Sequence, residues 1–231
     1  MRLALEALIR LFYPAHCGIC KDLLKIEAVT LCLDCAVKLE ELRFDLLEAI
    51  NSPEKDVSWN EAWSLFPYES IVRDLIKDSK FNSKPWLLNA FRPALRDCFK
   101  AVTSESSYDL LIPVPQGRGV WLERQFNPAE TLAALFSNGK IPVASNVLVK
   151  KSRVPPQSTL SREERLANPW GAFKMLRPGK VLNRRVLVID DILTTGATAD
   201  EVCRLILDAG ASKVGLLTLA RTPANASRSR R

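Results

Sequence analysis

The sequence is poor in histidine and contains no long apolar run. His16 is its only histidine, so a histidine-rich metal site is excluded, as is a histidine general base elsewhere in the chain. No apolar stretch approaches the roughly 20 residues of a membrane-spanning helix, so we expect no membrane insertion. In residues 1–12, Glu6 and Arg10 interrupt the apolar core that a secretory signal needs. We therefore expect a short amphipathic helix there, and a cytoplasmic protein with reduced cysteines.

Negative charge is outweighed by positive charge. The 231 residues include 33 lysines and arginines against 26 aspartates and glutamates, which gives a formal net charge of +7 and a pI near 9.2. Such a surface attracts polyanions such as phosphoesters or nucleic acid, and it equally serves solubility. The hydrophobic fraction of 47% is ordinary for a soluble globular protein, and the length suits one medium domain with a small appendage.

Four of the six cysteines crowd near the N-terminus. Cys17 and Cys20 form one C-x2-C pair, and Cys32 and Cys35 form another, with eleven residues between the two pairs. Each pair has the tight-turn spacing that aims two thiolates at one tetrahedral ion, and four thiolates saturate a structural Zn²⁺. The alternative is two disulfides or four unrelated cysteines, which a reducing cytoplasm disfavours. The neighbouring His16 is a further candidate ligand, but the four-thiolate set is complete without it.

From Trp63 onward, short apolar strands alternate with helical patterns, which is typical of an α/β fold. Asn127 is expected to cap a helix that has Pro128 at its first position, and Gly210 is expected to end the last helix. A βαβ unit with a parallel sheet is predicted near the C-terminus. Residues 151–169 are expected to form a functional loop or to be disordered, and residues 227–231 a basic disordered tail. Strands are predicted at residues 63–68, 109–114, 147–150, 186–189 and 213–219, and helices at 71–80, 87–101, 127–136 and 197–209.

The most informative segment runs from Val186 to Thr198. A buried strand delivers two adjacent carboxylates, Asp190 and Asp191, to its C-terminal end, where ligands bind in open α/β sheets. These carboxylates suit the vicinal hydroxyls of a ribose, or an outer position around Mg²⁺. The following turn opens a helix and offers backbone N–H and hydroxyl donors that suit a phosphate monoester; its residues are Thr194, Thr195, Gly196, Ala197 and Thr198. The segment therefore predicts a phosphorylated sugar, the alternative being a turn whose polar residues only cap the helix.

This segment resembles the phosphoribosyl pyrophosphate motif of type I phosphoribosyltransferases. The four-cysteine unit resembles the double zinc ribbon of the ComF family, a phosphoribosyltransferase-like family linked to competence for DNA uptake. Further motifs follow the pattern of that family: Ile112-Pro-Val-Pro115, Arg124-x-Phe126-Asn127, Pro156-Gln157, Leu160-Ser-Arg-x-x-Arg165, Asn168 and Gly171-Ala-Phe173. The resemblance implies a type I phosphoribosyltransferase-like parallel sheet flanked by helices, with a small N-terminal zinc ribbon. We expect the limits of the parts at residues 1–58, 59–222 and 223–231.

The resemblance also implies roles for individual residues. Asp190 and Asp191 would contact the ribose, residues 194–198 the 5′-phosphate, and Mg²⁺ would accompany phosphoribosyl pyrophosphate. Basic residues around the site are expected to contact anions, with a solvated charged surface as the alternative for any one of them; we select Arg124, Lys151 and Arg153. The family usually has Arg-Gly-Phe-Asn-Gln where this chain has Arg124-Gln-Phe-Asn-Pro128, so transfer chemistry is less firmly implied than ligand binding.

Two functions stay open at this stage. In the first, the chain transfers phosphoribose to an unknown acceptor. In the second, it is a non-catalytic competence protein that binds single-stranded DNA and contacts DNA-uptake proteins. The basic net charge suits the phosphates of a nucleic acid. Tryptophans suit stacking on unpaired bases, although most are expected in the core or over the site; the candidates are Trp59, Trp63, Trp86, Trp121 and Trp170.

Overall fold

A parallel four-stranded sheet forms the centre of the molecule. The computed structural model describes residues 14–25, 28–45, 57–82, 84–105, 107–151 and 171–223. The strand order is β1-β6-β5-β2, and every neighbouring pair is parallel. The strands are β1 (Glu61–Pro67), β2 (Leu110–Pro113), β5 (Arg185–Leu193) and β6 (Lys213–Arg221). The predicted α/β fold with a parallel sheet and a C-terminal βαβ unit is confirmed.

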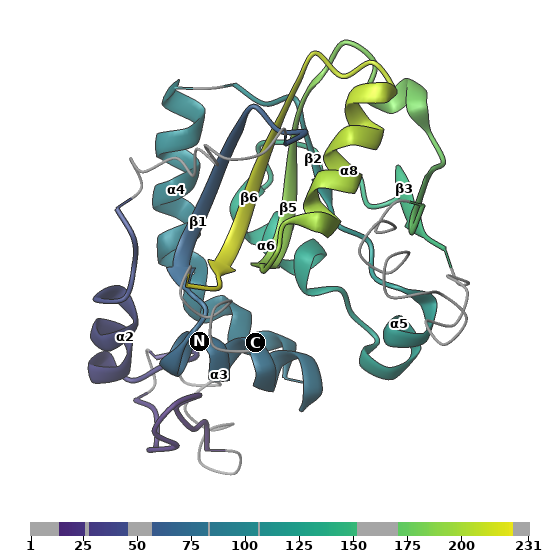
Figure 1. Ribbon diagram of the computed structural model, residues 1–231. Helices are drawn as coiled ribbons and strands as arrows, with labels where there is room; N and C mark the ends of the chain where they lie inside the picture. The colour runs from purple at the N-terminus through teal and green to yellow at the C-terminus, as the bar shows by residue number, and fades with distance from the viewer. Residues whose placement is uncertain are drawn as a thin grey trace, which may run out of the picture.

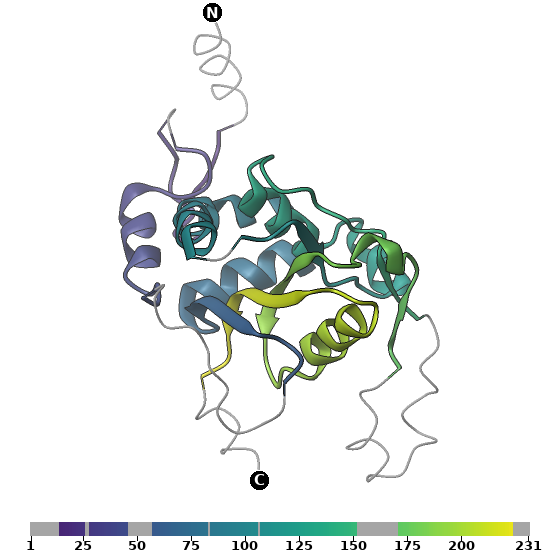
Figure 2. The same ribbon diagram turned by 90° about the horizontal axis from the view of Figure 1, so that it is seen from above.

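Helices cover both faces of this sheet (Figures 1 and 2). Helix α8 (Ala197–Asp208) packs on one face, and α4 (Arg92–Glu105) and α6 (Pro128–Ser137) pack on the other. The apolar run of β5 is buried on both faces of the sheet, because successive side chains of a strand point to opposite faces. Val186 and Val188 belong to the apolar cluster under α8, whereas Leu187 and Ile189 belong to the cluster under α4 and α6.

Three further helical elements follow the carboxyl ends of β1 and β2. Helix α3 (Ser70–Phe81) follows β1 and crosses below this edge of the sheet (Figure 1), and the 3-10 helix η1 (Pro85–Phe91) continues from it. Helix α5 (Arg118–Arg124) follows β2. A separate antiparallel pair consists of β3 (Leu148–Lys150) and β4 (Phe173–Met175), and the short η3 (Pro178–Lys180) follows β4 in the chain.

The four-cysteine ribbon packs on the main domain on the side of α4, away from α8 (Figure 2). It ends in α2 (Leu33–Glu40), and Ile19 and Leu31 pack against the main core. A Cβ atom at Gly18 would lie 2.5 Å from Cδ2 of Leu87, so the Leu87 side chain would have to shift to admit a larger residue where the ribbon meets η1. The ribbon therefore has a defined position on the domain.

Two predicted boundaries are wrong. The single helix expected at residues 87–101 is divided into η1 and α4, because Pro93 has no N–H to continue the helix through this point. The strand expected to end at Ile189 continues to Leu193, because β6 stays paired with it through Arg221. The carboxylates of Asp190 and Asp191 therefore lie within the last part of β5 and not beyond it.

The other predicted elements lie close to their expected positions where they are described. The Asn127 side chain accepts the N–H of Ala129 and caps α6, with Pro128 first in the helix, and Gly210 follows α8 with φ +90°. No helix in the described part of the chain is long and apolar enough to cross a membrane. The predicted helix at 1–12, most of the 151–169 segment and the basic tail lie outside the described residues. The limits of the parts stay predictions.

Candidate functional site

The turn between β5 and α8 forms a small polar cavity. Gly196 stands immediately before α8 with φ +80°, a backbone conformation that glycine adopts without strain. The hydroxyl oxygen of Thr195 accepts the N–H of Ala197 at 3.4 Å, so this threonine also caps the helix. The cavity has a volume of about 50 Å³ and is lined by Asp190, Ile192, Leu193, Thr194, Gly196, Thr198 and Ala199. A phosphate at a helix N-terminus fits this arrangement of donors.

Asp190 and Asp191 occupy different environments although they are adjacent. An Asp190 carboxylate oxygen accepts the N–H of Asp191 at 2.8 Å. Burial, followed by the negative charge of Asp191, raises the pKa of Asp190 to about 7. The Asp191 carboxylate lies 2.6 Å from the ammonium of Lys80, and the two side chains are only 15% and 13% exposed. The acidic pair therefore has a permanent internal counter-charge on one side.

Lys80 is a site residue that the sequence reasoning missed. It lies in the last turn of α3, and the spacing of four residues from Val72 through Ile76 to Lys80 places all three on one face of that helix. Val72 and Ile76 are completely buried. A lysine that continues an apolar helix face in this way is the signal that could have identified it.

A larger cavity of about 240 Å³ adjoins the carboxylates. Asp190, Asp191, Thr198 and Arg124 from the predicted set line it, together with Lys80 and Lys150. The other lining residues are Val114, Pro115, Gln116, Gly117, Val120, Asn127, Pro128 and Phe173. The cavity thus combines two carboxylates with three basic side chains, and it opens beside the turn after Pro115.

Side-chain contacts hold the walls of this cavity in place. The guanidinium of Arg124 lies 4.7 Å from the ring centroid of Phe81, at the end of α3. Asn127 donates from its side-chain amide to the carbonyl of Val114 at 3.0 Å, and Gln116 donates to the carbonyl of Phe126 at 2.6 Å. The loop after β2 is therefore tied to the start of α6.

The remaining predicted residues are less close to these cavities. Thr195 and Ala197 belong to the turn but do not line either cavity. Lys151 is exposed, and its backbone N–H donates to the carbonyl of Ala172 at 2.8 Å. Arg153 lies outside the described residues. The binding roles of all the predicted residues stay predictions.

Glu201 anchors the chain where the 152–170 segment ends. Its carboxylate accepts the N–H of Gly171 at 2.7 Å and that of Phe173 at 3.0 Å, and the residue is 2% exposed. It belongs to α8, the helix that begins at the turn of residues 194–198. Gly171 and that turn are thus fixed to the same helix.

The four predicted cysteines come together at one point. Their sulfur atoms all lie within 4.8 Å of one another, and those of Cys20 and Cys32 are 3.7 Å apart. Four sulfurs at 2.3 Å from a tetrahedral ion would be about 3.8 Å apart. Burial opposes ionisation of Cys17, but backbone N–H groups, including that of Cys32 at 3.4 Å, outweigh it and lower its pKa to about 6. This donor set fits a closed tetrahedral metal site.

His16 does not join this cluster. Its ring nitrogen Nδ1 lies 2.9 Å from the carbonyl oxygen of Lys21 and donates to it in one tautomer. The imidazole is therefore oriented by the ribbon backbone, and the four sulfurs form the cluster without it.

Known proteins resemble this chain along most of its length. Residues 126–231 match the family model described as phosphoribosyl transferase domain. The chain is 26% identical over 226 residues to competence protein F of Haemophilus influenzae, covering 91% of this chain and 98% of the relative. It is 25% identical over 202 residues to competence protein ComFC of Streptococcus pneumoniae, covering 87% and 80%. These matches support a phosphoribosyltransferase-like protein that is similar to the ComF family.

Similarity to other proteins is consistent with this assignment. The chain is 25% identical over 210 residues to the DNA utilization protein YhgH of Escherichia coli, covering 89% of the chain and 90% of the relative. A solved structure of a purine phosphoribosyltransferase from Pyrococcus horikoshii is 20% identical to this chain, with a TM-score of 0.37. The match covers 59% of this chain and 73% of that chain. The phosphoribosyltransferase-like fold of this chain rests on the match of residues 126–231 and on the strand, turn and helix around Asp190.

Proposed function

We propose that this chain binds 5-phosphoribosyl 1-pyrophosphate together with Mg²⁺ at the carboxyl end of β5. One observation carries the proposal: the small cavity in the turn and the larger cavity beside it share Asp190 and Thr198. A ligand that spans both cavities would have a phosphate at the helix N-terminus, a sugar beside the carboxylates and a second anionic group among basic side chains. Phosphoribosyl pyrophosphate has these three parts in this order.

Each part of the ligand has a chemically matched group. The 5′-phosphate would accept hydrogen bonds from the backbone N–H groups of the turn and gain from the dipole of α8. The ribose hydroxyls would donate to the carboxylates. The diphosphate would face Arg124 and Lys150. Mg²⁺, when bound, supplies further positive charge to the diphosphate. Because Lys80 already pairs with Asp191, we expect the metal to arrive with the diphosphate and not beforehand.

We infer that the same site can transfer phosphoribose. In this reaction the bond from the anomeric carbon to the diphosphate oxygen breaks, and its electron pair leaves with the diphosphate. The acceptor supplies the electron pair for the new bond to that carbon. Arg124 and Lys150 would stabilise the negative charge that develops on the leaving group.

We further propose that Cys17, Cys20, Cys32 and Cys35 hold a structural Zn²⁺. The mutual distances of their sulfurs and the N–H donor to Cys17 support this. Four thiolates complete a tetrahedral set and leave no open position for a substrate, so the metal would stabilise the ribbon and not perform chemistry.

Backbone amide shifts in ¹⁵N-labelled protein test how the ligand is divided between the cavities. Ribose 5-phosphate should shift the amides of Thr194, Gly196 and Thr198 without Mg²⁺, because it lacks the diphosphate. Phosphoribosyl pyrophosphate with Mg²⁺ should shift the same amides and also those of Gln116 and Gly117 in the larger cavity. Shifts that avoid residues 194–198 with both ligands would overturn the proposal.

A second candidate function is binding of single-stranded DNA. It is favoured by the net charge of +7 and by the competence and DNA-utilization names of the relatives. Phosphate contacts make such binding strongly dependent on salt. Binding that weakens linearly with the logarithm of salt concentration, and that is unchanged in the Asp190→Asn variant, would support this function as separate from the sugar site.

A further inference from the structure

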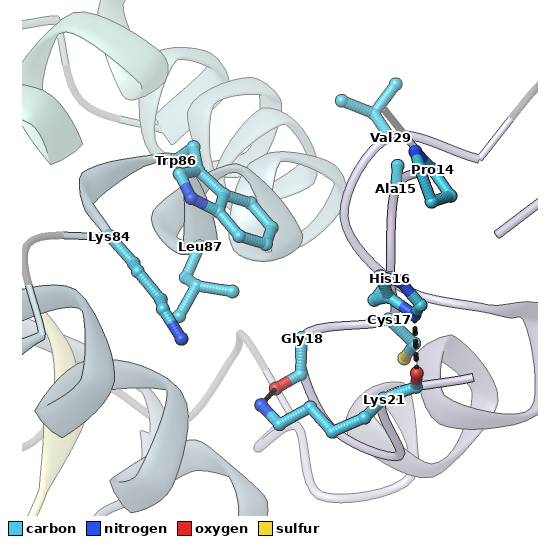
Figure 3. A pocket seen from close by; sticks show the side chains of 10 residues that line it. All are labelled: Pro14, Ala15, His16, Cys17, Gly18, Lys21, Val29, Lys84, Trp86 and Leu87. Atoms are coloured by element: carbon cyan, nitrogen blue, oxygen red, sulfur yellow. Dashed lines mark hydrogen bonds between the residues drawn. The ribbon is translucent and has the colours of Figure 1, made fainter. Parts of the chain in front are cut away.

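A cavity of about 360 Å³ lies at the junction of the four-cysteine ribbon and the main domain. Figure 3 shows the indole of Trp86 on the wall that comes from η1, and Pro14, His16 and Val29 on the facing wall that comes from the ribbon. Lys84 and Lys21 add one ammonium group from each side of the junction. The volume falls at the lower end of the roughly 300–1,000 Å³ that is typical of small-ligand pockets.

The walls of this junction cavity are held relative to each other. Within the ribbon, the backbone of Gly18 donates to the carbonyl of Thr30 at 2.9 Å, and Gly18 lies close to the side chain of Leu87 in η1. The ammonium of Lys21 donates to the carbonyl of Gly18 at 2.7 Å and lies 3.9 Å from a carboxylate oxygen of Asp78 in α3. The cavity is therefore preformed, which reduces the entropic cost of binding.

The lining combines apolar surface with positive charge. Trp86 lines the cavity and is 42% exposed, which is high for a large aromatic residue. The lining includes two lysines and a histidine but no aspartate or glutamate. A flat ring between apolar walls, joined to an anionic group, is the ligand chemistry that matches both features.

We propose that the junction cavity binds one unpaired nucleotide of single-stranded DNA. Its base stacks on the indole of Trp86, opposite Val29, and its phosphate faces Lys84 and Lys21. A duplex does not fit this role, because its bases are stacked and paired and cannot enter a cavity. The negative charge of an acidic peptide complements the lysines, but such a peptide has no flat ring to stack on Trp86. The inference rests on the second candidate function and gives it a site separate from the sugar site.

Fluorescence anisotropy with a labelled oligo-dT strand tests this assignment on the full, zinc-loaded chain. Trp86→Ala should weaken binding about tenfold or more, as expected for loss of one base–aromatic stack. Trp86→Phe should recover part of the affinity. Lys84→Ala should reduce the slope of log affinity against log salt by about 0.7, the value for one phosphate contact on a single strand.

Two control variants match these changes. Trp121→Ala removes a tryptophan in α5 that is 51% exposed, and Lys180→Ala removes one exposed positive charge in η3. Neither residue lines the junction cavity, so both variants should bind the strand as the unaltered chain does. Zinc content and the phosphoribosyl pyrophosphate titration check that each variant is folded.

The possible outcomes distinguish the junction cavity as the binding site from single-stranded DNA binding as a function. If the unaltered chain binds the strand and neither Trp86→Ala nor Lys84→Ala changes this, DNA binds elsewhere and the inference is overturned, while the second candidate function stands. If the unaltered chain does not bind the strand even at low salt, both fall. If a poly-glutamate peptide competes at the cavity and oligo-dT does not, the occupant is an acidic peptide and the inference is also wrong.

Discussion

At the scale of single residues, Lys80 has the largest expected effect. Its ammonium neutralises Asp191 at 2.6 Å in a largely buried position. Removing one partner of such a pair leaves an uncompensated charge, so Lys80→Met should lower the free energy of unfolding by up to about 3 kcal/mol. Urea denaturation measures this, with Lys77→Met as control because Lys77 is exposed on the same helix. Equal losses in the two variants would contradict the role assigned to this pair.

The raised pKa of Asp190 predicts a pH dependence of stability. Between about pH 4 and pH 7 the native chain keeps a proton on Asp190 that the unfolded chain releases, because the pKa rises from 3.8 to about 7 on folding. The native state binds more protons in this window, so the free energy of unfolding falls as the pH rises through it. Each pKa unit corresponds to about 1.4 kcal/mol.

The Asp190→Asn variant removes this titration. We expect its free energy of unfolding to fall less than that of the unaltered chain between about pH 5 and pH 8. Urea denaturation at both pH values measures the difference. Parallel pH profiles for the two proteins would show that Asp190 titrates in its ordinary range.

At the scale of elements, Glu201 joins α8 to the beginning of β4. Glu201→Ala would leave the N–H groups of Gly171 and Phe173 without their acceptor and should cost about 1–3 kcal/mol in the free energy of unfolding. Glu201→Gln keeps an acceptor oxygen and should be closer to the unaltered chain. Hydrogen exchange should accelerate at these two amides in the alanine variant. Unchanged exchange would show that another contact fixes this segment.

Local sequence patterns predicted the elements better than the contacts between them. The apolar run at Val186–Ile189 and the cap at Asn127 are encoded by neighbouring residues, and both predictions are confirmed. The split at Pro93 was readable from the residue itself but was missed. The extension of β5 past Ile189 depends on its pairing with β6, which no local pattern contains.

The residues of the site also divide into those encoded by neighbouring residues and those brought together by tertiary packing. The cluster of Asp190 and Thr198 is encoded within one strand, turn and helix, so the sequence selected four of the residues that line the small cavity: Asp190, Thr194, Gly196 and Thr198. Lys80 lies 111 residues before Asp191 in the chain, and Glu201 contacts a segment 28 to 30 residues away. Contacts of this kind arise from tertiary packing, and only the assembled fold identifies their partners.

At the scale of the whole molecule, the ribbon and the domain share apolar contacts through Ile19 and Leu31. If the cysteines hold Zn²⁺, chelation should open the ribbon, lower the thermal midpoint and change the fluorescence of Trp86 at the junction. Metal analysis should give one zinc per chain, and Cys20→Ser with Cys35→Ser should abolish it. A zinc-free chain of unchanged midpoint would contradict the structural metal.

The central claim is that phosphoribosyl pyrophosphate binds at Asp190–Thr198, and calorimetric titration with Mg²⁺ tests it most directly. The Asp190→Asn/Asp191→Asn variant is compared with Asp74→Asn/Asp208→Asn, which removes the same charge from two exposed positions. We predict saturable binding to the unaltered chain and to the control, and none to the first variant. Equal binding to both variants, or no binding to a folded, unaltered chain, would contradict the account.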